Sequence, residues 1–233
     1  MDDLIVRENL KRIEFNIQNA KAKRSSKREV NVLLATKTVP AERILFAAKE
    51  LGYRLIGENR VAELLSKYDA LCGETDMHLI GHLQTNKVKS VVGKVSLIES
   101  VDSVRLAREI DRVSSSLGVI SDILVEINIG KEESKGGIMP EDADRFFSEL
   151  AQFESIRPVG IMTMAPRCDV KSDYNKYFSK TYQIFLDISQ KYLYNIIEPV
   201  LSMGMSESFE EAVAAGATEV RIGSAVFGAR KYL

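Results

Sequence analysis

Lys37 ends an apolar stretch of the chain, and a lysine in such a place can act as an amine nucleophile. The stretch VNVLLATK (residues 30–37) has the length and the β-branched content of a buried strand. An ammonium group in a partly dry site loses its proton more readily, and the resulting amine forms Schiff bases with aldehydes. Lys37 is therefore the candidate for a covalent bond to an aldehyde.

Two segments near the end of the chain have the composition of a phosphate site. One is MGMS (203–206), where Ser206 is predicted to open a helix whose first N–H groups attract anions. The other is RIGSAVFG (221–228), where Gly223 and Ser224 let the backbone approach a ligand closely. Each segment alone is equally well explained by a helix cap or a packing glycine, and the combination with the lysine favours a ligand. An aldehyde that also carries a phosphate describes pyridoxal 5′-phosphate.

Alternating apolar and helical segments supply the elements that must position these residues. Strands are predicted at 30–38, 54–59, 77–83, 95–101, 122–129, 156–164, 199–205 and 219–227. Helices are predicted between them at 41–51, 60–71, 85–92, 103–117, 141–153, 172–192 and 206–215. Strict alternation of this kind indicates right-handed βαβ units and a parallel sheet.

Eight such units predict an α/β fold, a closed (β/α)8 TIM-type barrel that forms one domain over residues 1–233. The eighth predicted strand is followed by few residues, so no helix is expected after it, and an extra N-terminal helix at 2–23 is expected to fill that gap. In such barrels the functional residues collect at the C-terminal ends of the strands, and the loops after strands seven and eight frequently bind phosphate. Lys37 and both predicted phosphate segments fall at that end.

Bulk composition argues against several other classes of function. With 32 Lys and Arg against 33 Asp and Glu, the net charge of −1 gives no general attraction to nucleic acid or to anionic membranes. A basic run at 21–28 is interpreted as the link between the first helix and the first strand. The two cysteines, Cys72 and Cys168, lack the spacing of a zinc or disulfide framework. With no membrane-length apolar run and no signal-like start, a cytoplasmic protein is expected.

Motifs along nearly the whole chain resemble the pyridoxal phosphate homeostasis protein family, the single-domain relatives of the alanine racemase N-terminal barrel. They are ATKT (35–38), GEN (57–59), HLIGHLQTNK (78–87), EESKGGI (132–138), GIMTM (160–164), LSMGMS (201–206) and VRIGSAVFGAR (220–230). The chain departs from the family at three positions. Ser224 stands where the family frequently has threonine, and Ser208 stands where it frequently has aspartate. His82 stands where many bacterial members have proline. A specific role for His82 is accordingly not expected.

The resemblance implies pyridoxal 5′-phosphate as the cofactor and Lys37 as the residue that forms an aldimine with it. It further implies that Ser206, Gly223 and Ser224 surround the phosphate and that Arg221 faces the pyridine nitrogen. The full predicted cofactor-binding set is Lys37, Asn59, Met203, Ser206, Arg221, Gly223 and Ser224. No metal ligand and no catalytic residue is predicted.

Three functions are compatible with a Schiff-base lysine in this fold. The favoured one is a carrier that buffers the cofactor inside the cell and delivers it to apo-enzymes, without substantial catalysis. Arg221 is permanently cationic and disfavours a second positive charge on the ring, which makes the ring a weak electron sink. The alternative is an amino acid racemase-like enzyme, although the related racemases take a second acid/base tyrosine from a further domain, which this chain is not expected to have. A sugar-phosphate aldolase is disfavoured because such enzymes usually carry the lysine on a middle strand.

Overall fold

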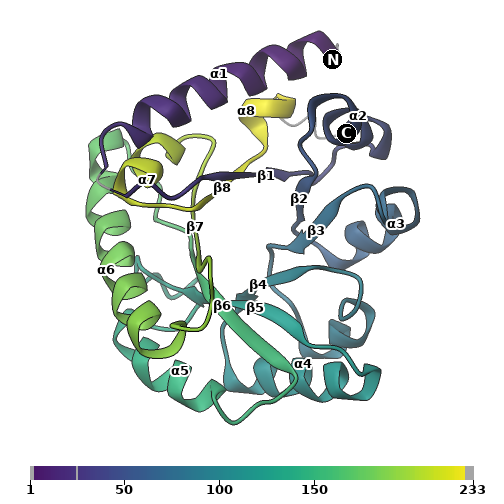
Figure 1. Ribbon diagram of the computed structural model, residues 1–233, viewed down its shortest axis with the longest axis vertical. Helices are drawn as coiled ribbons and strands as arrows, with labels where there is room; N and C mark the ends of the chain where they lie inside the picture. The colour runs from purple at the N-terminus through teal and green to yellow at the C-terminus, as the bar shows by residue number, and fades with distance from the viewer. Residues whose placement is uncertain (1–2, 25, 229–233) are drawn as a thin grey trace.

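The computed structural model describes residues 3–24 and 26–228 and shows a closed barrel of parallel strands surrounded by helices (Figure 1). Within these residues eight strands pair in chain order, and β8 pairs with β1 to close the barrel. They are β1 (Asn31–Ala35), β2 (Leu55–Glu58), β3 (Asp76–Leu79), β4 (Leu97–Val101), β5 (Ser121–Ile127), β6 (Ile156–Thr163), β7 (Val200–Met205) and β8 (Glu219–Ile222). Each predicted strand is present, so the predicted (β/α)8 barrel is confirmed.

The helices form the outer layer of the barrel. The α-helices of the described residues are α1 (Asp3–Lys21), α2 (Ala41–Leu51), α3 (Val61–Leu71), α4 (Val104–Leu117), α5 (Ala143–Leu150), α6 (Tyr174–Tyr192), α7 (Phe209–Ala215) and α8 (Ser224–Phe227). Short 3-10 helices lie at η1 (Thr85–Ser90), η2 (Pro140–Asp142) and η3 (Lys171–Asp173). In the connection between β3 and β4, η1 takes the place of a full α-helix.

Helix α1 covers the seam where β8 meets β1, as the sequence predicts (Figure 1). Its apolar residues recur at helical spacing and are buried: Val6, Leu10, Ile13, Ile17 and Ala20. They pack toward α7, α8 and α2. The predicted start of this helix at Asp2 lies outside the described residues, and so does Ser25 in the basic run. The rest of that run does link α1 to β1, and Arg24 donates to the carbonyl oxygens of Val213 and Ala217.

The predicted absence of any helix after the eighth strand is wrong in detail. β8 ends at Ile222 and the one-turn helix α8 follows, where the sequence predicts a strand to 227. At Gly223 the backbone leaves the extended conformation, and the Gly223 carbonyl accepts hydrogen bonds from the amides of Val226 and Phe227. Burial of these two apolar residues explains why their segment resembles a continuing strand. The residues after Gly228 lie outside the described part of the chain.

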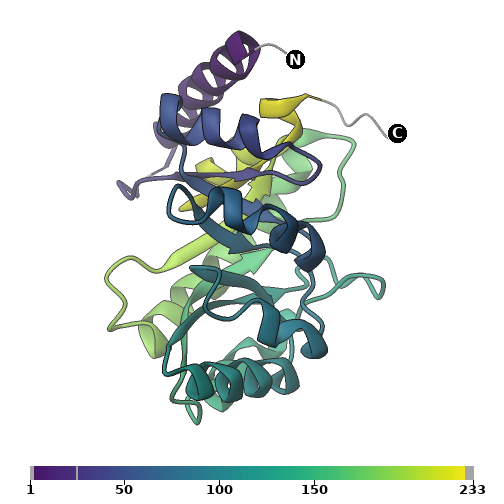
Figure 2. The same ribbon diagram turned by 90° about the vertical axis from the view of Figure 1, so that its right-hand side faces the viewer.

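Strand register brings three strand ends together at one end of the barrel. Leu34 pairs with Ile222, and Ala35 pairs with Gly57. The segments that follow β8, β1 and β2 are therefore neighbours. Figure 2 shows that the loops after β5 and β6 project from one side of the barrel. No helix within the described residues is long and apolar enough to cross a bilayer.

Candidate cofactor site

A cavity of about 890 Å³ opens at the C-terminal ends of the strands. Its lining includes five of the predicted site residues: Lys37, Ser206, Arg221, Gly223 and Ser224. Lys37 and Arg221 are 184 residues apart in the chain, and the closure of β8 on β1 makes their segments neighbours. The cavity volume lies in the usual range for small-molecule sites.

Lys37 lies in the turn just after β1 and is half-buried. The two preceding core residues of the strand, Leu33 and Leu34, are fully buried and anchor the base of the turn. Thr38 has a φ of 64°, in the left-handed region that β-branched residues rarely adopt. The turn therefore has a specific and uncommon backbone conformation at the residue next to Lys37.

Ser206 connects the loop after β7 to the start of α8. Its Oγ accepts a hydrogen bond of 3.2 Å from the amide of Ala225. The predicted helix start at Ser206 is wrong, because α7 begins at Phe209 and the residue that precedes it is Ser208. Ser208 donates its amide to the Met205 carbonyl and its Oγ accepts from the Met205 amide, which closes a turn ahead of the helix.

Gly223 makes a close backbone approach possible at the same place. A Cβ on this residue would lie 2.9 Å from the carbonyl oxygen of Ala35 and 3.3 Å from its Cβ. The end of β8 can therefore sit against the end of β1 only if residue 223 has no side chain. Ser224, the next residue, is exposed at the cavity.

Arg221 reaches the cavity from inside the barrel and is only 5% exposed. Its guanidinium donates to the Oγ of Ser202 at 2.7 Å and to the carbonyl of Thr163 at 2.8 Å. Nη1 also lies 3.9 Å from a carboxylate oxygen of Glu99. These contacts fix the cation in one orientation beneath the cavity.

A buried network of ionisable groups continues from Arg221 into the barrel. Ser202 donates to Glu99 at 2.7 Å, and the other Glu99 oxygen lies 2.7 Å from Nδ1 of His78. Burial opposes charge on His78, but the hydrogen bond to Glu99 and the charge of Glu219 raise its pKa. Burial and the neighbouring Glu99 raise the pKa of Glu219 to about 8. Glu219 therefore keeps its proton at neutral pH, whereas the hydrogen bond and charge of His78 and the charge of Arg221 lower the pKa of Glu99 against the effect of burial.

Two predicted site residues lie away from the described lining of the cavity. Asn59 is exposed beyond the end of β2. Met203 is fully buried and packs in the core between the barrel and its helices. Side chains alternate along a strand, and Ser202 points into the barrel, so Met203 faces outward.

The structure adds lining residues that the strand ends do not indicate. Tyr174 begins α6, where the sequence favours an ordinary packing role. Its ring stacks on Phe178, and its hydroxyl accepts a hydrogen bond of 3.3 Å from the amide of Cys168. Lys135, in the loop after β5, and Arg43, in the first turn of α2, also line the cavity. These three side chains reach the cavity from a loop or from the start of a helix. Their positions depend on the paths of loops, which the periodicity of the sequence does not predict.

The residues present fit a phosphorylated aldehyde. Lys37 supplies an amine, Ser206 and Ser224 supply hydroxyl groups, and Gly223 lines the same cavity. Arg221 supplies a fixed cation at the base of the same cavity.

Known proteins are similar to this chain over nearly its whole length. The sequence model of the family described as alanine racemase, N-terminal domain, matches residues 9–231. The chain is 41% identical over 228 residues to the pyridoxal phosphate homeostasis protein of Aquifex aeolicus, covering 97% of this chain and 98% of that one. The crystal structure of an unknown protein from Bifidobacterium adolescentis is similar with a TM-score of 0.88, 32% identity and 97% coverage of both chains. The structure of PipY from Synechococcus elongatus PCC7942 with PLP bound has a TM-score of 0.81 and 29% identity, and the match covers 96% of this chain and all of that one.

Proposed function

The chain belongs to the pyridoxal phosphate homeostasis protein family, and on that basis we propose that it binds pyridoxal 5′-phosphate in the barrel cavity. One observation carries the proposal. The cavity brings together Lys37 and the segments that contain Ser206 and Gly223, which combine an amine with a place for a phosphate. Both groups of this cofactor therefore have partners in one site.

Each residue has a distinct part in holding the cofactor. Lys37 would hold the aldehyde through its Nζ, and the chemistry that the cofactor would supply there is Schiff-base formation with loss of one water molecule. Ser206, Ser224 and the backbone at Gly223 surround the phosphate, and charge-assisted hydrogen bonds of this kind are stronger than neutral ones. Arg221 would face the pyridine nitrogen and disfavour its protonation, because two adjacent positive charges repel.

A cofactor held in this way suits storage and delivery better than catalysis. An enzyme that uses the ring as an electron sink benefits from a protonated pyridine nitrogen, which Arg221 disfavours. We therefore propose that this single barrel domain buffers the cofactor in the cytoplasm and passes it to apo-enzymes, which would be its partners.

The first test is Lys37→Ala. The variant should fold and lose the covalent bond, because the side chain lies at a strand end and contributes little to the core. Borohydride reduction followed by peptide mapping should label Lys37 in the wild type and nothing in the variant.

Lys135→Ala is the matched control, since Lys135 is the other described lysine of the cavity lining. It should keep the label at Lys37. A Lys37→Ala protein that retains a full, reducible chromophore with no substitute lysine labelled would refute the assignment.

Tyr174 supports the second candidate function, a racemase-like enzyme, because its side chain lines the same cavity as Lys37. A positioned general acid or base typically accelerates a reaction about 10²–10⁴-fold. If Tyr174 acts in this way, the protein should turn over an amino acid at a measurable rate. The test is incubation of the cofactor-loaded protein with L-amino acids in deuterated water. We expect no exchange at Cα near the ordinary enzymatic range of about 1–10³ s⁻¹. Exchange at such rates that Tyr174→Phe abolishes would instead identify an enzyme.

A further inference from the structure

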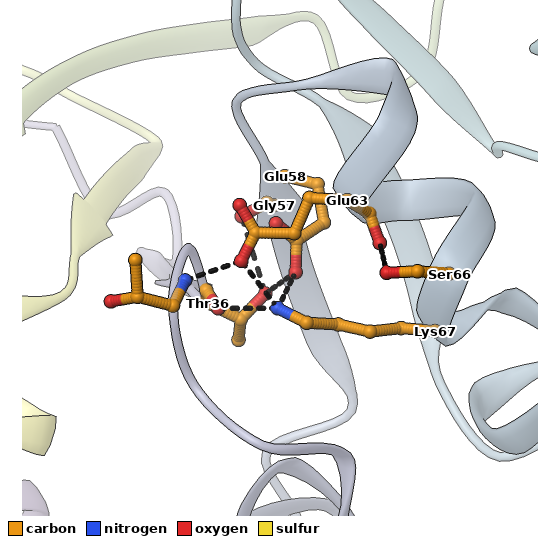
Figure 3. A network of polar contacts seen from close by, with 7 residues as sticks. Thr36, Gly57, Glu58, Glu63, Ser66 and Lys67 are labelled. Carbon is orange, nitrogen blue, oxygen red and sulfur yellow. Dashed lines mark hydrogen bonds and ion pairs between the residues drawn. The ribbon is translucent and has the colours of Figure 1, made fainter. Parts of the chain in front are cut away.

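Lys67 lies beneath the turn that carries Lys37 and contacts three oxygen atoms there (Figure 3). Its Nζ lies 2.9 Å from the carbonyl of Thr36, 2.8 Å from a carboxylate oxygen of Glu58 and 2.8 Å from a carboxylate oxygen of Glu63. Only 12% of the Lys67 side chain is exposed. One ammonium group thus joins α3 to the ends of β1 and β2.

The same network holds the backbone on both sides of Lys37. Before it, the Thr36 carbonyl accepts from Lys67, and the Thr36 hydroxyl donates to Glu58 at 2.7 Å. After it, the Thr38 amide donates to the same Glu63 oxygen that accepts from Lys67. Thr38 is the residue in the left-handed conformation, which costs free energy and persists only where neighbours enforce it.

The charges of the network depend on Lys67. Burial raises the pKa of Glu58, and the hydrogen bonds from Lys67 and Thr36 oppose that rise. Burial also acts against ionisation of Glu63, yet the bonds from Lys67 and the Thr38 amide lower its pKa overall. Without the ammonium group, the two carboxyls would lose their cation and the Thr36 carbonyl its donor. Glu63, which accepts from the Thr38 amide, would then no longer be held in position by an ion pair.

We infer that Lys67 is a positioning residue for Lys37: through Glu58 and Glu63 it fixes the turn that aims the Lys37 amine at the aldehyde. The inference rests on the proposed Schiff-base role of Lys37. Attack on a carbonyl requires alignment of the reacting atoms, and a displacement of about 1 Å can cost on the order of 100-fold in rate. Binding of the phosphate, by contrast, depends on Ser206 and Gly223 across the cavity and should not need Lys67.

The test compares Lys67→Met with the wild type, using the full chain freed of cofactor. Pyridoxal 5′-phosphate is mixed with each protein, and imine formation is followed by absorbance and by borohydride trapping at Lys37. We expect the variant to form the imine roughly 10- to 100-fold more slowly. The probe for non-covalent binding is pyridoxine 5′-phosphate, which has an alcohol in place of the aldehyde, and its affinity should change less than about two-fold.

Lys49→Met is the matched control. Lys49 forms a 2.8 Å ion pair with Glu74 away from the cavity, so its loss should leave both measurements unchanged. If Lys67→Met fails to fold, Glu63→Ala and Glu63→Gln replace it, because the glutamine keeps an oxygen for the Thr38 amide and the alanine does not. Slow imine formation in the alanine variant alone would support the inference.

The outcomes separate the two proposals. A wild type that forms no adduct at Lys37 would overturn the proposed function and this inference with it. If the wild type forms the adduct and Lys67→Met forms it equally fast, only the positioning role is overturned. The same holds if Lys67→Met loses affinity equally for pyridoxal 5′-phosphate and pyridoxine 5′-phosphate.

Discussion

Hydroxyl groups from two different loops meet at the predicted phosphate end of the cavity. Ser206 follows β7 and accepts the Ala225 amide, while Ser224 follows β8 and begins α8. The contact with Ala225 fixes the relative positions of the two loops before any ligand arrives. A preorganised pair of this kind loses little entropy when it binds an anion.

Replacing both serines tests this pair. Ser206→Ala with Ser224→Ala should weaken retention of pyridoxal 5′-phosphate about 100-fold or more, since each of the two charge-assisted hydrogen bonds contributes about 1.5–3 kcal/mol and 1.4 kcal/mol is one decade. Pyridoxal, which lacks the phosphate, should be affected far less. Equilibrium dialysis with both ligands gives the comparison.

A serine far from the cavity provides the control. Ser116→Ala on α4 removes a hydroxyl that donates only to the Val113 carbonyl, and it should change neither affinity. If the double variant loses pyridoxal and its phosphate ester equally, the serines do not bind the phosphate.

Residue type and strand position predict which residues at the strand ends line the cavity. Lys37 and Arg221 stand out because charge at the end of an apolar strand is unusual, and both line the cavity. Met203 belongs to the set that the family resemblance implies, but the alternation of side chains along β7 places it in the core between the barrel and its helices. Tyr174 could not be found this way, since the path of the loop before α6 brings it to the cavity.

At the scale of elements, each strand was predictable because it is a short apolar run between helical segments. The ends of the strands are harder to predict than the strands themselves. The sequence predicts that the first strand reaches residue 38, whereas β1 ends at Ala35 and the turn that carries Lys37 follows it. Hydrogen bonds to side chains of neighbouring elements form that turn, and a local pattern cannot show them. The connection 224–227 was misassigned for a related reason, since Val226 and Phe227 bury as a helical turn under α1 rather than in the sheet.

The packing of α1 has a consequence for the site. This helix lies against α7, which follows the first predicted phosphate segment, and against α8, which lies within the second. Its residue Asn9 donates to the carbonyl of Val226, and Asn16 donates to Glu210 on α7. The N-terminal helix therefore supports the phosphate end of the cavity from behind as well as covering the barrel seam.

For the molecule as a whole, the near-neutral net charge conceals a strongly charged barrel interior. Glu99, Glu126, Glu219, His78 and Arg221 are all buried within it. Charges taken out of water are tolerated only when they are paired or neutralised by a proton. Glu99 is paired, whereas burial raises the pKa of Glu126 to about 7 and that of Glu219 to about 8, so both carboxyls keep a proton to a higher pH than an exposed glutamate.

The protonation of Glu126 in the barrel interior should affect how the stability of the protein depends on pH. Burial, with the negative charge of Asp102, raises its pKa to about 7 from the ordinary value of 4.5, despite the opposing charge of Arg221. The folded state therefore binds a proton that the unfolded state has lost between about pH 4.5 and 7. The contribution of this group to stability is complete below the lower value and is lost as the pH rises through the upper one.

Glu126→Gln should remove that loss, because glutamine does not titrate. The free energy of unfolding of the variant, relative to the wild type, should rise by on the order of 2–3 kcal/mol between pH 5 and pH 8, since each pKa unit corresponds to about 1.4 kcal/mol. Urea denaturation at the two pH values measures this difference. Glu109→Gln is the control: Glu109 pairs with Arg112 on the surface, which lowers its pKa, so its effect should be constant over the same range. A Glu126→Gln difference that is equally constant would mean that the wild-type carboxyl is already ionised at pH 5, and that the interior of the barrel holds one more negative charge than its contacts account for.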